Sequence, residues 1–195
     1  MNTKIALSGI SILASLALVG GATFALFTDV GTSTNNVFAT GNLDLKLSDD
    51  TPETDQDDVT ASFGGSNLGP GDCTTTQQLR VKNSGTINGD HVEISVANSV
   101  TDNGTPAVDP IDQFMMLNLF QYDGGNISVA DFNSNGFADL DDLENVGVDN
   151  LGLGDLNTDH DIDLSVCLDS SAGDDLQGDS VSSDWTITLN QDATQ

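Results

Sequence analysis

Basic residues are almost missing from this sequence of 195 residues, which holds 4 Lys+Arg against 31 Asp+Glu. Nucleic acid is therefore excluded as a partner, because phosphate binding needs clustered lysine and arginine. The formal net charge of -27 repels itself in a compact chain at low salt. Concentrated salt removes that repulsion, since the Debye length falls to about 3 Å at 1 M. High charge is also typical of disordered chains, but the alternating apolar runs described below favour a folded, halophile-type protein.

Histidine is almost as scarce, because the chain has only His91 and His160. Catalytic zinc takes several histidine or carboxylate ligands around an open position, and no H-E-x-x-H pattern occurs here. The sequence also lacks a G-x-S-x-G nucleophile elbow and a phosphate-binding glycine loop. His91 opens an alternating run and is expected to be an exposed polar residue. We therefore predict that the protein is not an enzyme.

Cysteine is limited to Cys73 and Cys167, which excludes a disulfide-rich scaffold. Outside the cell the two residues can form one disulfide, and two buried free thiols are the alternative. A chain of about 170 residues, which is what remains after removal of an export segment, buries a core without many disulfides.

An apolar run occupies residues 5–27 and follows the single basic residue Lys4. A basic start, an apolar centre and small residues near the end are typical of a signal peptide. Gly20, Gly21, Ala22 and Ala25 are the small residues near a cleavage point. We predict a signal peptide over residues 1–25, cut by an export signal peptidase, with an uncleaved membrane anchor as the alternative. Both interpretations place the rest of the chain outside the cytoplasm, at the cell surface or beyond it.

The remainder of the chain shows repeated strand patterns. Apolar residues alternate with polar ones over residues 43–47, 79–81, 92–96, 162–168 and 185–189. Residues 114–122 are almost continuously apolar and are expected to form a central strand covered on both faces. Turn-forming residues separate these runs, and the acidic stretch 49–58 reads as a solvated loop. About seven strands with little helix predict an all-β protein, an antiparallel β-sandwich over residues 42–195.

Three segments stand out as motifs: the run TFALFTD into NVFATGNLDL, the block NLGPGD followed by LRVKNSGTI, and the run LQGDSVSSDWTITL at residues 176–189. Together they resemble the TasA/camelysin family of exported fibre subunits and the related archaeal bundling pilins. The resemblance implies a jelly-roll-like sandwich that polymerises with identical subunits into an extracellular filament or biofilm-matrix fibre. It also implies donor-strand complementation, in which the mature N-terminal segment enters the sheet of the next subunit. Camelysin-type proteins have also been classed as metallopeptidases, which the scarcity of ligands disfavours.

Residues 26–41 are the predicted donor segment. An open sheet edge exposes unpaired backbone groups and accepts an added strand. Residues 26–39 span about 45 Å when extended, which exceeds a typical strand of about 20 Å. The side chains expected to be buried in the neighbouring subunit are Leu26, Phe27, Val30, Val37 and Phe38. The alternative is a flexible lead, with Val37 and Phe38 packed on their own domain.

Residues 131–142, DFNSNGFADLDD, resemble a calcium-binding loop. Oxygen-bearing side chains occupy loop positions 1, 3, 5, 9 and 12, and Gly136 stands at position 6, where the EF-hand loop turns. The predicted ligands are Asp131, Asn133, Asn135, the carbonyl of Phe137, Asp139 and Asp142. A short helix is expected to follow, carrying Leu140 and Leu143. The alternative is an acidic surface turn, and a monomeric calcium-binding surface domain is the alternative function.

Two weaker patterns complete the sequence. Aspartates over residues 155–163 echo the calcium loop but also fit the solvent face of a strand. The sequons at Asn103 and Asn126 permit N-glycosylation of an exported chain.

Overall fold

A computed structural model of the protein describes residues 39–49, 54–60, 62–104, 107–153 and 155–191. The chain divides into two units, Met1–Ala39 and Thr40–Gln195, and every element below belongs to the second unit. The predicted signal peptide and most of the predicted donor segment lie outside the described residues. Within the described ranges, no helix is long and apolar enough to cross a bilayer.

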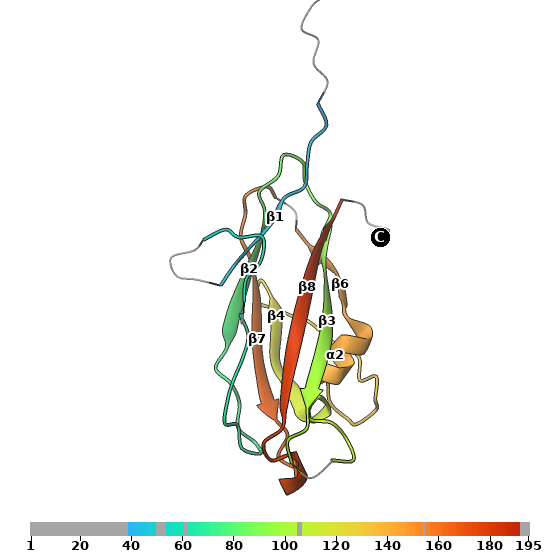
Figure 1. Cartoon of the computed structure of the whole chain (residues 1–195). Helices are drawn as coiled ribbons and strands as arrows, with labels where there is room; N and C mark the ends of the chain where they lie inside the picture. The colour runs from blue at the N-terminus through green and yellow to red at the C-terminus, as the bar shows by residue number, and fades with distance from the viewer. Residues whose placement is uncertain (1–38, 50–53, 61, 105–106, 154, 192–195) are drawn as a thin grey trace, which may run out of the picture. The chain divides into compact units, whose positions relative to one another are not determined.

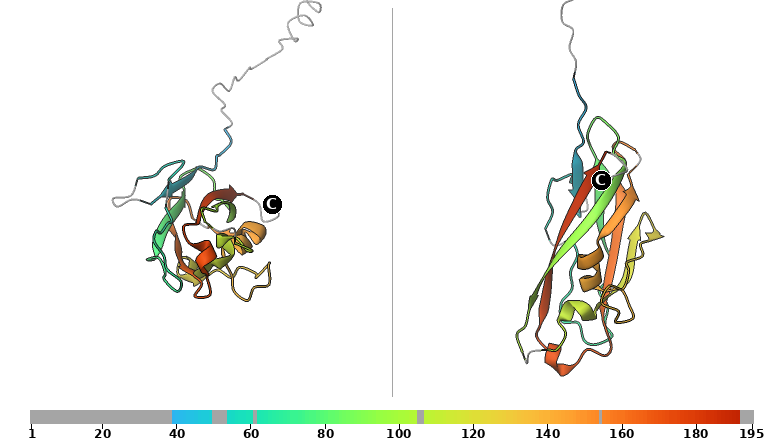
Figure 2. Two further views of the ribbon diagram at one scale, coloured as in Figure 1. Left: turned by 60° about the horizontal axis from the view of Figure 1, so that its bottom comes forward. Right: turned by 90° about the vertical axis from the view of Figure 1, so that its right-hand side faces the viewer.

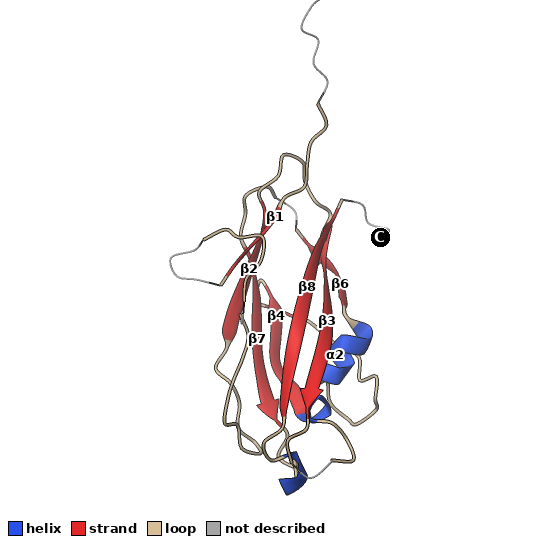
Figure 3. Cartoon of the chain, in the orientation of Figure 1, coloured by secondary structure: helices blue, strands red, loops and turns tan. Residues whose placement is uncertain are grey.

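The described strands form two antiparallel sheets (Figure 1). The five-stranded sheet has the order β1 (Leu45–Ser48), β2 (Gln77–Asn83), β7 (His160–Leu168), β4 (Met115–Tyr122) and β5 (Gly125–Asn126). The three-stranded sheet has the order β6 (Val148–Gly152), β3 (His91–Thr101) and β8 (Ser180–Asn190). Figure 3 shows the helical elements at one side and end of the sheets: α2 (Leu140–Val146), η1 (Ile111–Phe114) and η2 (Asp174–Leu176).

The chain passes repeatedly between the sheets, because each of β3, β4, β6, β7 and β8 lies in the sheet opposite to the strand before it. This arrangement confirms the all-β prediction at the level of two antiparallel sheets with one α-helix in the described part. The jelly-roll connectivity stays a prediction.

Alternating residues build the core between the sheets. Leu79 and Val81 of β2 are 2% and 0% exposed, and they face Val92 and Ile94 of β3, at 0% and 2%. A strand places successive side chains on opposite faces, so one apolar face per strand is enough to fill this interior. The period-two pattern of the sequence therefore identified the core residues of these strands.

Residues 114–122 were predicted to form a central strand covered on both faces, and the burial on both faces is wrong. The segment is a strand, β4, but its neighbours are β7 and the two-residue β5. Within β4 only Phe120 is fully buried. The apolar side chains divide between two clusters, because Phe114 packs with Ile111 and Leu168 near the end of the sheet, away from the main core. The central strand is β7.

The acidic stretch 49–58 is more than a solvated loop. Gln56 exchanges two backbone hydrogen bonds with Leu47, of 2.8 and 2.9 Å, which places it beside β1. Asp55 forms an ion pair with Lys82 at 2.7 Å, and Asp57 pairs with Lys46. The acidic stretch therefore neutralises basic side chains of β1 and β2.

Candidate functional site

An open groove of about 500 Å³ lies between the two sheets along β8. Strands β2 and β7 form one wall, and β8 forms the other. The apolar side chains in these walls include Leu79, Leu164, Val166, Val181, Trp185 and Ile187. The interior of the sandwich is therefore accessible from one side.

Both walls of the groove carry unpaired strand edge. In the described part of the molecule β8 pairs with β3 along its whole length and with no strand on its other side. Opposite it, β1 pairs with β2 only from Arg80 to Asn83, which leaves residues 77–79 without a described partner on that side. Such edges present N–H and C=O groups to an incoming strand.

The burial of facing side chains shows that the core is incomplete beside β8. Val92, Ile94 and Val96 of β3 are buried. Ile187 stands directly opposite Ile94 and Trp185 opposite Val96, yet both β8 side chains are only partly buried. Directly opposed residues share one face of a sheet, so the difference arises from what covers β8 on its open side.

Phe63 covers part of the groove. It comes from the loop before β2, and its ring lies 4.9 Å from that of Trp185. Phe120 approaches Trp185 edge-on from β4, at 6.0 Å. Phe63 could not be recognised from the sequence, because a single aromatic residue in a Ser- and Gly-rich loop gives no periodic signal.

The donor residues predicted from the sequence, Leu26, Phe27, Val30, Val37 and Phe38, lie outside the described residues. The description begins with the exposed residues 39–42. Asn42 is tied to Thr86: its carbonyl accepts from the Thr86 N–H at 2.8 Å, and its N–H donates to Thr86 Oγ1 at 3.0 Å. A Cβ on Gly41 would come within 2.1 Å of Ile87 Cγ2, so a larger residue at this position would force the Ile87 side chain to move.

The predicted calcium loop folds around its own side-chain oxygens. Asp131 accepts hydrogen bonds from the N–H of Asn135 at 3.1 Å and of Gly136 at 2.9 Å. Asp142 Oδ1 accepts from the N–H of Phe132 at 2.8 Å. Gly136 has φ 104°, a conformation that side chains disfavour. The turn at position 6 thus has the backbone form that its glycine allows.

The end of this loop is also the start of α2. Asp139 and Asp142 form a capping box, with Asp142 N–H donating to Asp139 Oδ1 at 2.9 Å and Asp139 N–H to Asp142 Oδ2 at 3.1 Å. Both are 0% exposed, and burial raises the pKa of the Asp139 carboxyl. Asn133 and Asn135 donate to Asp139 Oδ2 at 3.3 and 2.7 Å, whereas Phe137 donates its N–H to Asn135 Oδ1. The structure brings the predicted ligands together, and calcium in the loop stays a prediction.

Cys73 and Cys167 form a disulfide, with Cα atoms 3.9 Å apart. The bond joins the segment before β2 to the central strand β7 across a sequence separation of 94 residues. The sequon residues are both exposed. The Asn103 side chain donates to the Gly178 carbonyl at 3.0 Å, and Asn126 Oδ1 accepts from Gln121.

The prediction that His91 is exposed is wrong, because this residue is 3% exposed. It lies on β3, where it is paired with Gly152 of β6 on one side and with Asn190 of β8 on the other. Its Nδ1 lies 3.0 Å from Asp90 Oδ2, and its Nε2 lies 3.4 Å from Glu93 Oε1 and from Asp149 Oδ1. The hydrogen bond with Asp90 raises the pKa of His91 above its ordinary value of 6.5.

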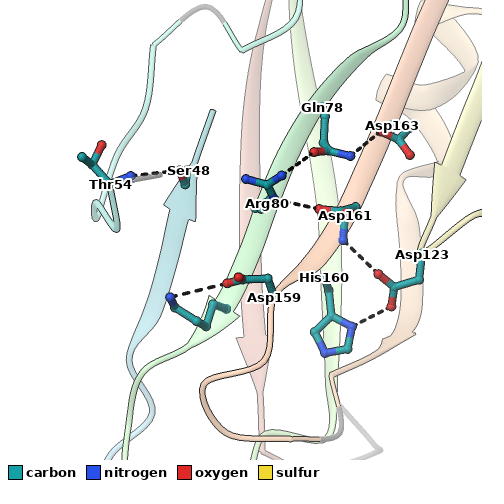
Figure 4. A network of polar contacts seen from close by, with 10 residues as sticks. Ser48, Thr54, Gln78, Arg80, Asp123, Asp159, His160, Asp161 and Asp163 are labelled. Atoms are coloured by element: carbon teal, nitrogen blue, oxygen red, sulfur yellow. Dashed lines mark hydrogen bonds and ion pairs between the residues drawn. The ribbon is translucent and has the colours of Figure 1, made fainter. Parts of the chain in front are cut away.

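Aspartates of residues 155–163 pair with basic side chains on the outer face of the five-stranded sheet (Figure 4). Arg80 Nε donates to Asp161 Oδ1 at 3.1 Å, and Lys82 lies 3.4 Å from Asp159. His160 Nδ1 lies 2.6 Å from Asp123, a residue that follows β4. These contacts match the solvent-face interpretation of the pattern.

A family model described as camelysin metallo-endopeptidase matches residues 1–195. The chain belongs to the TasA/camelysin family. A comparison with curated proteins found no match. Members of the camelysin family are exported or lie at the cell surface, which supports an exported, fibre-like protein at the level of the family.

A metallo-endopeptidase of the camelysin type implies a bound metal, and catalytic zinc needs a suitable set of ligands. The described histidines do not form such a set. His91 and His160 belong to different sheets. The described cluster with a histidine joins a single imidazole, His91, to Glu93 and Asp149. Catalytic zinc sites use donor sets such as three His, two His with Glu, or two Cys with His. The Asn190 amide nitrogen also lies 3.3 Å from His91 Nε2, the one nitrogen that faces both carboxylates. We derive no hydrolytic step from these residues.

Proposed function

We propose that this protein is a structural subunit of an extracellular filament. In this proposal residues 26–41 of one subunit add a strand to the groove beside β8 of the next subunit. The observation that carries the proposal is the open groove with unpaired edge on both walls. Membership of the TasA/camelysin family supports the exported, fibre-like character.

The chemistry of the groove and of the segment is complementary. A strand added along β8 satisfies its unpaired backbone groups, and pockets between alternate side chains accept apolar residues. Residues 26–41 supply large apolar side chains at both ends, with Leu26 and Phe27 at one and Val37 and Phe38 at the other. Burying each of them stabilises the complex by about 1.5–3 kcal/mol.

The length of the segment also suits the groove. A partner for the 11 residues of β8 needs about 36 Å of extended chain, at ~3.3 Å per residue. Residues 26–39 provide about 45 Å, which leaves a short linker before the sandwich. Insertion from one subunit into the next is heterologous and does not close, so it propagates a filament.

The test compares the mature exported protein with a variant that lacks residues 26–36. We expect the wild type to form filaments in electron micrographs and the deletion variant to stay monomeric. Filaments of normal appearance from the deletion variant would contradict strand donation. A wild type that is monomeric at every concentration would support the alternative, a monomeric surface domain.

A peptide of residues 26–41 makes the test specific for the groove. Trp185 is the single tryptophan of the chain and lines the groove, so its fluorescence reports occupancy. We expect the peptide to shift the emission of the deletion variant to shorter wavelength. The matched control peptide carries Val37→Ser and Phe38→Ser and is expected to shift the emission less at equal concentration, because it has lost two of the five apolar side chains that the groove would bury.

We also propose that the subunit has no peptidase activity, and the single-imidazole cluster at His91 supports this proposal. The measurement is cleavage of an unfolded protein substrate by the exported protein in the presence of Zn²⁺. Zinc-dependent cleavage by the wild type that the His91→Ala variant lacks would overturn the proposal.

A further inference from the structure

The short helix η1 lies beside α2 (Figure 2). Three carboxylates converge where these two elements pack against each other. Asp112 comes from η1, and Asp141 and Glu144 come from α2. Residues three positions apart are neighbours on a helix surface, so the two α2 residues face η1 together. One oxygen from each of the three side chains lies within 4.8 Å of the other two. Asp112 and Glu144 are outside the loop 131–142, and no pattern in the sequence had identified them.

One oxygen of the buried Asp112 carboxylate lacks a partner, although the carboxylate accepts hydrogen bonds from the backbone of Asp112 and Gln113. The residue is 5% exposed, and its Oδ1 is buried with no hydrogen-bond partner. Buried polar atoms are almost always paired, because an unpaired one loses its hydration without compensation. The charged groups that face Asp112 have the same sign, since Asp141 and Glu144 both repel it. Burial, followed by this repulsion, raises the pKa of Asp112.

The basic side chains of the described residues lie elsewhere. Lys46 is on β1, and Arg80 and Lys82 are on β2; all three form ion pairs with aspartates there. Helix α2 has no basic residue in its last turn. Within the described part of the chain, lysine and arginine therefore leave the carboxylates around Asp112 uncompensated.

We propose that Asp112, Asp141 and Glu144 bind a hard divalent cation of the calcium class. Calcium takes oxygen ligands at about 2.3–2.6 Å, so two ligands of one ion are at most about 5 Å apart. The three oxygens satisfy this limit in their present positions. Glu144 is exposed, which leaves water able to complete the coordination shell. The ion gives Asp112 its missing partner and ties η1 to α2.

The test titrates the full exported chain with CaCl₂ in concentrated NaCl and follows heat and thermal unfolding. Asp112→Asn and Glu144→Gln each remove one charged ligand. Asp109→Asn is the matched control, because it removes the same charge from an exposed residue before η1. Asp131→Asn tests the loop 131–142 separately.

We expect Asp112→Asn and Glu144→Gln to weaken one calcium-binding event by about tenfold or more. Asp109→Asn and Asp131→Asn are expected to leave that event intact. With chelator present, Asp112→Asn should unfold at the same or a higher temperature than wild type, because the neutral amide removes a repelling charge. Equal calcium affinity in wild type and both ligand variants overturns the proposal, as does loss of all binding in Asp131→Asn alone. The exposed Glu144 keeps the test valid if Asp112→Asn misfolds.

Discussion

The proposed role of the groove leads to a quantitative prediction for Ile187. Replacing Ile187 with Ala removes three carbon atoms, worth about 0.8 kcal/mol each when fully buried, or about 2.4 kcal/mol in total. In the free subunit Ile187 is only partly buried, although the opposite residue Ile94 is fully buried. At most about a third of Ile187 is exposed in the free subunit, so ~1.6 kcal/mol or more of this energy is lost from folding, and at most ~0.8 kcal/mol is lost only when a strand fills the groove.

The part of that energy gained in the groove appears as weaker assembly. Since 1.4 kcal/mol corresponds to a factor of ten, a loss of ~0.8 kcal/mol should raise the critical concentration for filament formation up to about fourfold in Ile187→Ala. Sedimentation of filaments over a series of protein concentrations measures this value. Urea unfolding of the subunit that lacks residues 26–36 measures the loss from folding.

Thr188→Ala is the matched control, because Thr188 is the next residue of β8 and is exposed on the outer face. Its removal changes strand preference by up to about 1 kcal/mol and leaves the groove wall unaltered. We expect its critical concentration to stay within about twofold of wild type, a difference of less than ~0.5 kcal/mol. The reasoning is refuted if Ile187→Ala assembles like wild type, or if Thr188→Ala is impaired to the same degree.

Three further predictions concern the stability of the sandwich. Replacing Cys73 and Cys167 together by Ala should lower the unfolding free energy by up to about 4–5 kcal/mol, because the disulfide closes a long loop; urea unfolding measures this loss, and reducing agent should reproduce it in the wild type. The raised pKa of His91 means that the folded state binds this proton more tightly than the unfolded state. The contribution of His91 to the free energy of unfolding is therefore complete below the ordinary pKa of 6.5, and it is lost as the pH rises through the pKa of the folded state. The groups facing His91 are Asp90, Glu93 and Asp149, and thermal unfolding from about pH 6 to about pH 9 should show a fall in the wild type that His91→Gln lacks. Leu143→Ala should cost about 2–5 kcal/mol in urea unfolding, because this α2 side chain is 0% exposed, and a loss of less than ~1 kcal/mol would show that α2 contributes little to the core.

The strands could be predicted because their burial has one simple cause. Val92, Ile94 and Val96 alternate with polar residues, and the fold buries that one face. The burial of residues 114–122 was predicted wrongly because two arrangements have the same composition. One is a strand buried on both faces, and the other is a segment whose apolar side chains divide between two clusters. The sequence shows that Phe114 is apolar. It does not show that Phe114 packs against Ile111 and Leu168 in a separate cluster.

The sites that sequence missed depend on contacts between distant segments. His91 is buried because β6 and β8 come from far along the chain and pair with β3 on both sides. Asp112 meets Glu144 only because η1 packs on α2. The loop 131–142 was visible in the sequence, since its oxygens and its glycine follow one another at fixed spacing. Local patterns thus predict local geometry, whereas the groove and the carboxylate cluster arise from tertiary packing.

Charge explains why a filament of this protein would depend on an apolar strand. The full chain has a formal charge of -27, so copies of it repel one another, and the described basic side chains are already paired on β1 and β2. Complementary charge is therefore a weak means of joining two copies. Residues 26–41 carry a single charged side chain, Asp29, among apolar and neutral polar residues. A segment of this composition brings apolar area and backbone hydrogen bonds to the neighbour while adding little repulsion, and concentrated salt screens what remains.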